Sequence, residues 1–443
     1  MSQLISFRNI NKLAVPAIIS GIAEPILSAT DTAIVGNIPI QGTASLAAVG
    51  IVGTFLSALI WILAQTRAVI SAIISQYLGA GKIKEVETLP AQAILFNIGL
   101  SILILIATVP FIKEIFVWLE AEGQVLTYCI SYYRIRVWGF PLSLFVFAIF
   151  GIFRGLQNTF WPMIIALIGV VSNIVLDFTL VYGIDGFIEP MHLEGAAWAS
   201  LFSQAIMAIL SFVLLIKKTN VSLRVEMQIH PEMKRFLIMS INLFIRSLAL
   251  NTTLVLAARE ATRLGTNYIA AHSIAIQLWL FFAFFIDGYG GAGNILGGRL
   301  LGAKDYKNLV VMAKKVNIYG IIVAGILGGI SLCIPESLGL IFTKDQEVLR
   351  IFTSFFYLVV IVLPVNALAF VGDGIFKGLG ETSFLRNVLL GSTFLGFVPV
   401  LLLGRYLDWK LPGIWVAITI WMLIRGIALV IKFKNKYYRL ATI

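Results

Sequence analysis

Long apolar segments, separated by short polar loops, recur along the whole chain. A membrane-spanning helix takes about 20 apolar residues, and the segments lack the strand-like alternation of a membrane β-barrel. The pattern therefore predicts an all-α integral membrane protein with twelve transmembrane helices. We expect these helices over residues 12–36, 46–75, 89–112, 128–152, 161–184, 194–216, 235–258, 268–297, 312–335, 350–376, 384–404 and 411–432.

Lys and Arg are distributed unevenly among the loops. If the two termini and the even-numbered loops lie on one side, that side carries 21 basic residues and the opposite side carries seven, counting those at the helix ends next to each loop. Cytoplasmic loops are enriched in Lys and Arg, so we expect a multi-pass protein of the cell inner (plasma) membrane with both termini in the cytoplasm.

Composition agrees with this interpretation. Hydrophobic residues make up 59% of the chain and charged residues only 12%, which excludes an ordinary soluble domain. The loop bias also explains the net charge of +11. We therefore expect the lipid bilayer, and no nucleic acid, as a partner of the chain.

The chain is also an internal duplication with an offset of 223 residues. Phe153-Arg-Gly-Leu156, for example, returns as Phe376-Lys-Gly-Leu379. Six helices per half is an even number, so both halves enter the membrane from the same side. We predict two six-helix lobes related by a pseudo-twofold axis along the membrane normal, with a substrate path between them. The predicted lobes are residues 1–216 and 235–443, joined by a cytoplasmic linker over 217–234.

Two acids of the first half lie at similar depth in their helices. Asp31 is about 19 residues into the first helix and Asp177 is about 16 residues into the fifth, and both helices enter from the cytoplasm. Acids at membrane depth are costly and are often functional. We interpret them as a proton or cation site, shared with Asn173, which lies one helical turn before Asp177. The alternative is that these residues are unrelated and hydrogen-bond to neighbouring helices.

Glu24 and Pro25 precede Asp31 in the same helix. Pro25 removes a helical hydrogen bond, which predicts a kink. Glu24 lies seven residues before Asp31, so on a continuous helix the two acids share one face. Glu24 either pairs with a cation or faces a cavity, where it attracts cationic substrate. A kinked helix with inward-facing acids suggests an element that bends when a proton or cation binds.

The second half carries two acids and two arginines within its apolar segments. Arg246 and Arg425 lie in the middle of the seventh and twelfth segments, and Asp287 and Asp373 lie in the inner parts of the eighth and tenth. Because an unpaired charge at this depth is strongly destabilising, we expect each arginine to lie within pairing distance of an acid. This charge network either holds the helices in register or forms a second proton or cation site.

The sequence offers little for metal, nucleotide or catalytic chemistry. Its three histidines share no metal-ligand spacing. Leu78-Gly-Ala-Gly-Lys82 lacks the first Gly and the final Ser or Thr of a phosphate-binding loop. No acids, histidines and nucleophile cluster at one interface, as a membrane enzyme would need. We expect that the protein is not an enzyme and binds no cofactor, and no metal beyond a Na⁺ that Asp31 and Asp177 would hold. Any pumping would therefore draw on an H⁺ or Na⁺ gradient.

Short motifs occur in a specific order along the whole chain. They are Leu13-Ala-Val-Pro16, Thr30-Asp-Thr-Ala-Ile-Val-Gly36, Asn173-Ile-Val-Leu-Asp177, Gly195-Ala-Ala-Trp-Ala-Ser200, Ile245-Arg-Ser-Leu248, Asp287-Gly288, Asp373-Gly374 and Arg425-Gly426. Together they resemble the multidrug and toxic compound extrusion (MATE) family, and most closely its DinF-type branch.

The resemblance implies a twelve-helix, V-shaped secondary transporter that exports amphipathic, often cationic, compounds by alternating access. The exchanged cation is H⁺ or Na⁺, of which we favour H⁺. By the same resemblance Asp31, Asn173 and Asp177 form the coupling site of the first lobe, and Ser200 adds a hydroxyl group. Glu24 departs from the family pattern. We expect a monomer.

A different function stays open at this point. A flippase for lipid-linked oligosaccharides or other lipids, of the same superfamily, would also have repeated helical lobes. It would be expected to have a strongly cationic central cavity, whereas the first-lobe charges here are mainly acidic.

Overall fold

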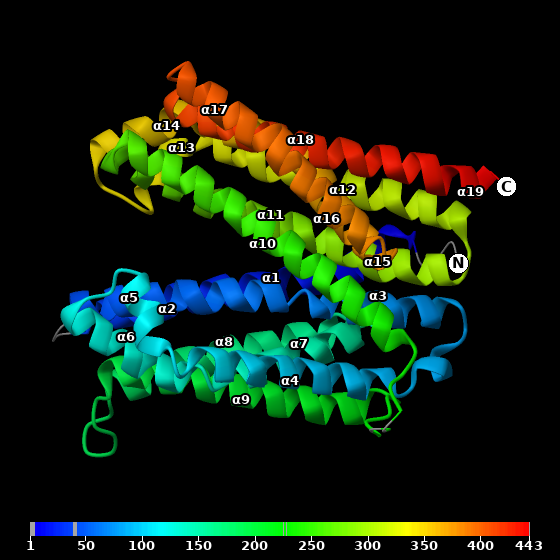
Figure 1. Ribbon diagram of the computed structural model, residues 1–443, viewed down its shortest axis with the longest axis horizontal. Helices are drawn as coiled ribbons and strands as arrows, with labels where there is room; N and C mark the ends of the chain where they lie inside the picture. The colour runs from blue at the N-terminus through cyan, green and yellow to red at the C-terminus, as the bar shows by residue number, and fades with distance from the viewer. Residues whose placement is uncertain (1–4, 39–41, 225, 227, 443) are drawn as a thin grey trace. The chain divides into compact units, whose positions relative to one another are not determined.

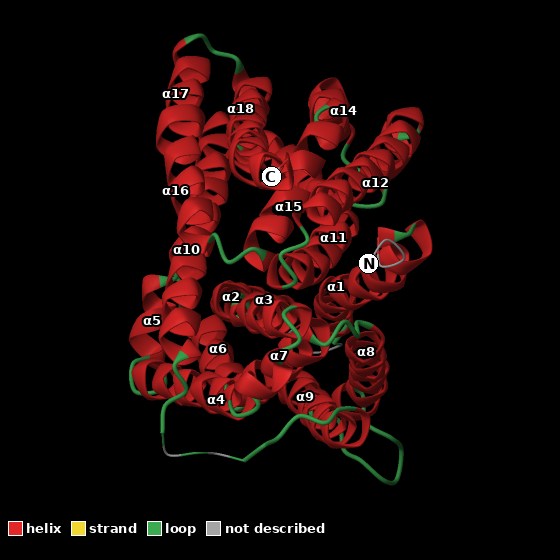
Figure 2. Ribbon diagram, turned by 90° about the vertical axis from the view of Figure 1, so that its right-hand side faces the viewer, coloured by secondary structure: helices red, strands yellow, loops and turns green. Residues whose placement is uncertain are grey.

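The computed structural model describes residues 5–38, 42–224, 226 and 228–442, apart from the side chains of Glu24 and Ser28. This part of the chain is helical and forms no strand beyond an isolated bridge between Ile184 and Ile188; Figure 2 shows helices joined by loops. Among the described residues, ten helices are long and apolar enough to cross a membrane, or twelve spans if each of two bent pairs counts as one. The predicted all-α membrane fold is confirmed.

Each predicted segment has a helical counterpart (Figure 1). The helices of the first half are α1 (Phe7–Gly36), α2 (Gly42–Leu63), α3 (Thr66–Gly79), α4 (Leu89–Thr108), α5 (Ile112–Trp118), α6 (Gly123–Arg136), α7 (Gly139–Gly155), α8 (Phe160–Val181) and α9 (His192–Lys218). Those of the second half are α10 (Glu232–Leu264), α11 (Thr266–Gly302), α12 (Tyr306–Cys333), α13 (Pro335–Leu340), α14 (Gln346–Ile361), α15 (Leu363–Gly378), α16 (Thr382–Ser392), α17 (Val398–Tyr406), α18 (Lys410–Phe433) and α19 (Arg439–Thr442).

Contacts group the chain into two compact units. One unit contains Met1–Ile18, Ser75–Lys82 and Leu237–Ile443, and we call it the C-terminal unit; the other contains Ile19–Ile74 and Ile83–Phe236, and we call it the N-terminal unit. Helices α1, α3 and α10 therefore contribute residues to both units. The lobe and linker boundaries expected from the sequence stay a prediction.

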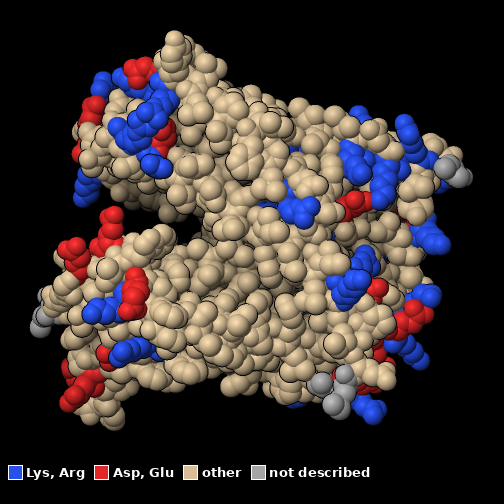
Figure 3. Space-filling view, viewed as in Figure 1, with Lys and Arg blue, Asp and Glu red and all other residues tan. Residues whose placement is uncertain are grey.

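Each unit is a helix bundle with an apolar interior. In the N-terminal unit, α9 packs against α6, α7 and α8, and α7 also packs against α4. In the C-terminal unit, α11 packs against α12, α14 and α15, and α15 also packs against α18. On the face shown in Figure 3, most charged side chains gather near the helix ends, and uncharged side chains cover the middle of the helices. This distribution suits helices whose middle parts face lipid.

The internal duplication reappears in the helix boundaries. Two spans are bent pairs: α6 and α7 meet at 46°, and α14 and α15 meet at 53°. The first pair begins at Gly123 and ends at Gly155, whereas the second begins at Gln346 and ends at Gly378. Both boundaries obey the 223-residue offset of the sequence repeat. The bend is therefore part of the repeated scaffold.

Glycines four residues apart bring α7 close to α3 in the N-terminal unit. A Cβ atom at Gly151 would meet the backbone carbonyl oxygen of Arg67, and one at Gly155 would meet the side chain of Ile74 and the carbonyl oxygen of Ser71. Without the glycines the two backbones would have to separate. Small residues with this spacing allow close helix contact in membranes.

The C-terminal unit repeats this crossing between α15 and α11. A Cβ atom at Gly374 would meet the backbone of Gly290, and one at Gly378 would meet the backbone of Asn294. All four positions lie 223 residues after their counterparts. The duplicated sequences Gly-Ile-Phe-Arg-Gly and Gly-Ile-Phe-Lys-Gly thus specify the same helix crossing twice.

This crossing predicts that Gly374→Leu destabilises the protein. The new side chain would collide with the α11 backbone, and overpacking of this kind costs about 1–3 kcal/mol. Gly325→Leu in α12 is the matched control, because nothing lies within 4 Å of a Cβ atom at that position. Thermal unfolding in detergent, followed by size-exclusion chromatography, should give a midpoint several degrees lower for Gly374→Leu than for Gly325→Leu. Equal midpoints would contradict the close crossing.

Candidate functional site

Four polar side chains of the N-terminal unit meet in its interior. Asp31 comes from α1, Asn173 and Asp177 come from α8, and Ser200 comes from α9. Asn173 and Asp177 are one turn apart and share a helix face, and α8 packs along α9. Asp31 is 5% exposed, Ser200 1%, and the other two are fully buried. The sequence predicted these residues as one site, and the structure brings all of them together.

Hydrogen-bond donors surround the Asp31 carboxyl group. Ser200 Oγ donates to Asp31 Oδ2 at 3.2 Å. With its amide nitrogen turned toward the acids, Asn173 donates to Asp31 Oδ1 at 2.9 Å and to Asp177 Oδ2 at 3.2 Å. The opposite amide orientation would place the Asn173 oxygen against carboxyl oxygens, which lack donors when ionised. Asn173 therefore bridges the two acids.

The two carboxyl groups also lie within hydrogen-bonding reach of each other. An ionised carboxylate only accepts hydrogen bonds, so a bond between Asp31 and Asp177 requires a proton on one of them. Asp177 Oδ1 is shut off from solvent and has no hydrogen-bond partner among the described residues. This geometry suits a pair that holds one proton between two acids, whose titrations are then coupled.

Arg136 belongs to the surroundings of this pair, and the sequence analysis missed it. It is the last residue of α6, and its charge acts on both Asp31 and Asp177. Tyr132, one turn earlier on α6 and buried, is hydrogen-bonded to Arg136. The sequence could have indicated it, because Arg136 lies inside the fourth apolar segment, 128–152, and a basic residue within a membrane span is costly and often functional.

Two further predicted residues stay untested by this geometry. The side chain of Glu24 lies outside the described residues. Pro25 is half-buried within α1, which continues as one helix from Phe7 to Gly36. The kink at Pro25 and the role of Glu24 remain predictions.

The charge network of the second half centres on Asp373. This buried acid on α15 forms an ion pair with Arg246 of α10, and its Oδ2 atom lies 3.8 Å from Arg425 Nη2. Arg246 and Arg425 are 5% and 1% exposed. The Arg425 guanidinium also lies 4.8 Å from the centre of the Trp421 ring, a cation–π contact. Each arginine therefore lies within pairing distance of an acid.

Asp287 is not part of this buried core. Its side chain is exposed, and the described residues contain no ion pair between Asp287 and either arginine. It lies close enough to Arg246 for the two charges to interact. Within the part of the chain that the structure describes, no group of three or more His, Cys, Asp or Glu side chains could hold a metal ion.

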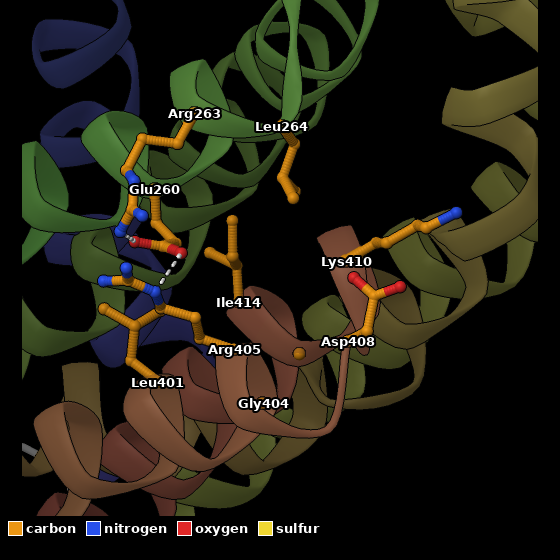
Figure 4. Close-up of a pocket in the computed structure, with 10 residues that line it drawn as sticks. Glu260, Arg263, Leu264, Leu401, Gly404, Arg405, Asp408, Lys410 and Ile414 are labelled. Carbon is orange, nitrogen blue, oxygen red and sulfur yellow. Dashed lines mark hydrogen bonds and ion pairs between the residues drawn. The ribbon is translucent and has the colours of Figure 1, made fainter.

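A surface pocket of about 140 Å³ lies at one end of the C-terminal unit, between the ends of α10, α17 and α18. Figure 4 shows Glu260 between Arg263 and Arg405, with ion-pair distances of 3.2 and 4.0 Å. Such exposed ion pairs contribute little to stability, and the pocket contains no predicted site residue. The remaining lining residues are Leu264, Leu401, Gly404, Asp408, Lys410, Gly413 and Ile414.

Comparison with known proteins identifies the family. The sequence profile of the MatE family matches residues 16–179 and 243–402 of this chain. The chain belongs to the MatE family. Asp31, Asn173 and Asp177 lie inside the matched ranges, whereas Ser200 lies between them. The resemblance to MATE proteins noted in the sequence is therefore confirmed.

Individual relatives agree with this assignment. DETOXIFICATION 43 of Arabidopsis thaliana is 29% identical over 313 residues, which cover 70% of this chain and 57% of the relative, so the match spans little more than half of that protein. DNA damage-inducible protein F of Escherichia coli (strain K12) is 26% identical over 431 residues, 96% of this chain and 91% of the relative.

Solved structures share the fold. The MATE transporter VcmN of Vibrio cholerae in its bent form superposes with a TM-score of 0.90, with 16% identity, over 100% of this chain and 98% of that chain. At 16% identity this similarity shows a shared fold and does not show a shared function.

The buried network predicts a large difference between breaking the ion pairs and replacing them. Asp373→Leu would leave two buried guanidinium groups without their acid and should cost about 3–5 kcal/mol of unfolding free energy. The triple variant Arg246→Met, Asp373→Leu, Arg425→Met removes all three charges and should recover most of that loss. Chemical unfolding in detergent micelles measures both. A single variant as stable as the wild type would rule out a structural role for the network.

Proposed function

We propose that this MatE protein is a secondary active antiporter that exports amphipathic or cationic drugs and toxic organic compounds by alternating access. The coupling ion is H⁺ in preference to Na⁺, and the coupling site is formed by Asp31, Asp177, Asn173 and Ser200. The observation that supports this most directly is the hydrogen-bonded pair of buried carboxyl groups. A pair that needs a proton to form its own hydrogen bond is a natural site for proton exchange.

Loss of the shared proton would change the balance of forces at this site. Two ionised carboxylates at hydrogen-bonding distance repel each other, and the apolar helices around them provide little solvation. The proton-free state therefore favours a different arrangement of α1 against α8 and α9. Exchange requires that the two arrangements differ in affinity for substrate. Pro25 in α1 gives a point where the helix can bend, and Glu24 gives a negative charge that would attract cationic substrate.

The proposal includes the orientation of the protein in the membrane and its oligomeric state. The excess of Lys and Arg in the even-numbered loops supports a multi-pass protein of the cell inner (plasma) membrane with both termini in the cytoplasm. Both lobes belong to one chain, so a monomer contains the full transport path. Arg246, Asp373 and Arg425 hold the second lobe together, with Asp287 at the edge of the network.

A proteoliposome assay tests the coupling site. Wild-type protein should expel a cationic dye when a pH gradient is imposed, and Asp31→Asn should fold and insert but lose this efflux, because its amide imitates a permanently protonated acid. Asp185→Asn is the matched control: it removes an exposed loop acid of the same half and should leave efflux unchanged. Wild-type efflux from Asp31→Asn under both H⁺ and Na⁺ gradients would show that Asp31 does not couple transport.

The same vesicles separate the antiporter from the flippase. A flippase would move a fluorescent lipid between leaflets without a pH gradient and would leave the dye inside. That result, in protein that is folded by size-exclusion chromatography, would replace the antiporter proposal.

A further inference from the structure

Arg136 occupies an unusual position for a cation. It ends α6 where α6 and α7 meet at 46°, near the middle of the fourth span. The carbonyl groups at a helix C-terminus carry partial negative charge, which favours a basic residue in the last turn. This explains why an arginine is tolerated there. It does not explain what its side-chain nitrogen atoms bind.

The guanidinium group has unused hydrogen-bond donors. Its Nε and Nη1 atoms are both shut off from solvent and have no hydrogen-bond partner among the described residues. A buried donor without an acceptor costs free energy. Two such donors on one cation therefore point to an acceptor, negatively charged by preference, that binds Arg136 in another state of the protein.

That acceptor is already close by. The titratable groups that interact with Arg136 are Asp31 on α1, Asp177 on α8 and Tyr132 on α6. While the acids share a proton, their hydrogen bonds are made to each other, to Asn173 and to Ser200. Among the acids, Asp177 Oδ1 has no hydrogen-bond donor, and on Arg136 the Nε and Nη1 atoms have no acceptor.

The groups around the acids also discriminate between cations. Asn173 and Ser200 both direct hydrogen atoms toward the carboxyl oxygens. A bound Na⁺ needs several oxygen ligands with their lone pairs directed at it. In this orientation the donors suit a protonated or guanidinium-paired acid, whereas a Na⁺ would require the Asn173 amide and the Ser200 hydroxyl to turn their oxygen lone pairs toward it.

We propose that Arg136 is the resident counter-ion of the Asp31–Asp177 pair and makes this site selective for H⁺ against Na⁺. This inference rests on the proposed function. When the shared proton leaves, the carboxylate that loses its hydrogen bond pairs with the free donors of Arg136. The guanidinium thus supplies the positive charge that a Na⁺ would otherwise bring. Arg136 acts as a specificity-determining residue and does not carry the transported proton.

A charge count supports this role. With one shared proton the pair carries one negative charge, which Arg136 neutralises. With both acids ionised the site carries one net negative charge in the presence of Arg136 and two in its absence. Removing Arg136 thus increases the attraction for any external cation and removes the group that competes with it.

The test measures Na⁺ binding directly, without transport. Purified protein at alkaline pH, where the acids are ionised, is incubated with radioactive Na⁺ in a scintillation proximity assay. Arg136→Met keeps much of the side-chain length without the charge and should bind Na⁺ roughly tenfold or more tightly than the wild type. Arg136→Lys keeps the charge and should behave like the wild type, which a purely steric role would not produce.

A second substitution locates the new site. The Na⁺ binding gained by Arg136→Met should disappear in the double variant Arg136→Met, Asp31→Asn. The inference is overturned if the wild type already binds Na⁺ as tightly as Arg136→Met, or if the gained binding survives Asp31→Asn. If Arg136→Met fails to fold, efflux from wild-type proteoliposomes decides: efflux driven by a Na⁺ gradient alone contradicts the inference, and efflux driven only by a pH gradient supports it.

These outcomes are separate from failure of the proposed function. If Asp31→Asn retains efflux, the coupling proposal fails whatever the Na⁺ measurements give. If Asp31→Asn abolishes efflux while Arg136→Met gains no Na⁺ binding, the coupling site stands and only the role of Arg136 is wrong.

Discussion

The cost of placing charge inside an apolar helix bundle governs this structure. A buried charge must lie near an opposite charge or be neutralised, because neither lipid nor packed hydrocarbon can solvate it. In the C-terminal unit the solution is direct pairing of Asp373 with two arginines. In the N-terminal unit Asp31 and Asp177 instead meet each other, with Asn173 and Ser200 as donors, and the proton that we propose they share is the solution. The cost of buried charge is thus met by fixed ion pairs in the C-terminal unit and, in our proposal, by a protonation-dependent acid pair in the N-terminal unit.

This contrast explains how a duplicated scaffold carries unlike sites. The bends, the outer boundaries of the two bent spans and the glycine crossings recur at the same offset in both halves. The charged residues of the buried N-terminal site do not: Asp31, Asp177 and Arg136 have no counterpart of the same charge in the second half. Helix crossing and ion chemistry are therefore specified by different residues on the same helices.

The sequence was sufficient for the features that depend on local or periodic patterns. Apolar length gave the spans, and the spacing of Asn173 and Asp177 put both on one face of α8. The structure was needed where contacts depend on how distant helices pack. Ser200 was expected only from family resemblance, since a serine in an apolar segment has many partners available. Arg136 was missed because its relevance depends on the bend between α6 and α7 and on which acids lie opposite. Asp287, expected within the buried network, lies exposed beside it.

The duplicated glycines have a consequence for the evolution of this chain. Gly151, Gly155, Gly374 and Gly378 allow close helix approaches, so substitution at these positions is restricted in both halves. After duplication, one half could therefore acquire fixed ion pairs and the other a proton-dependent pair, while the backbone frame stayed the same. The buried charged residues of the two halves can differ because the helix crossings depend on glycines, which are separate from the residues that carry the charges.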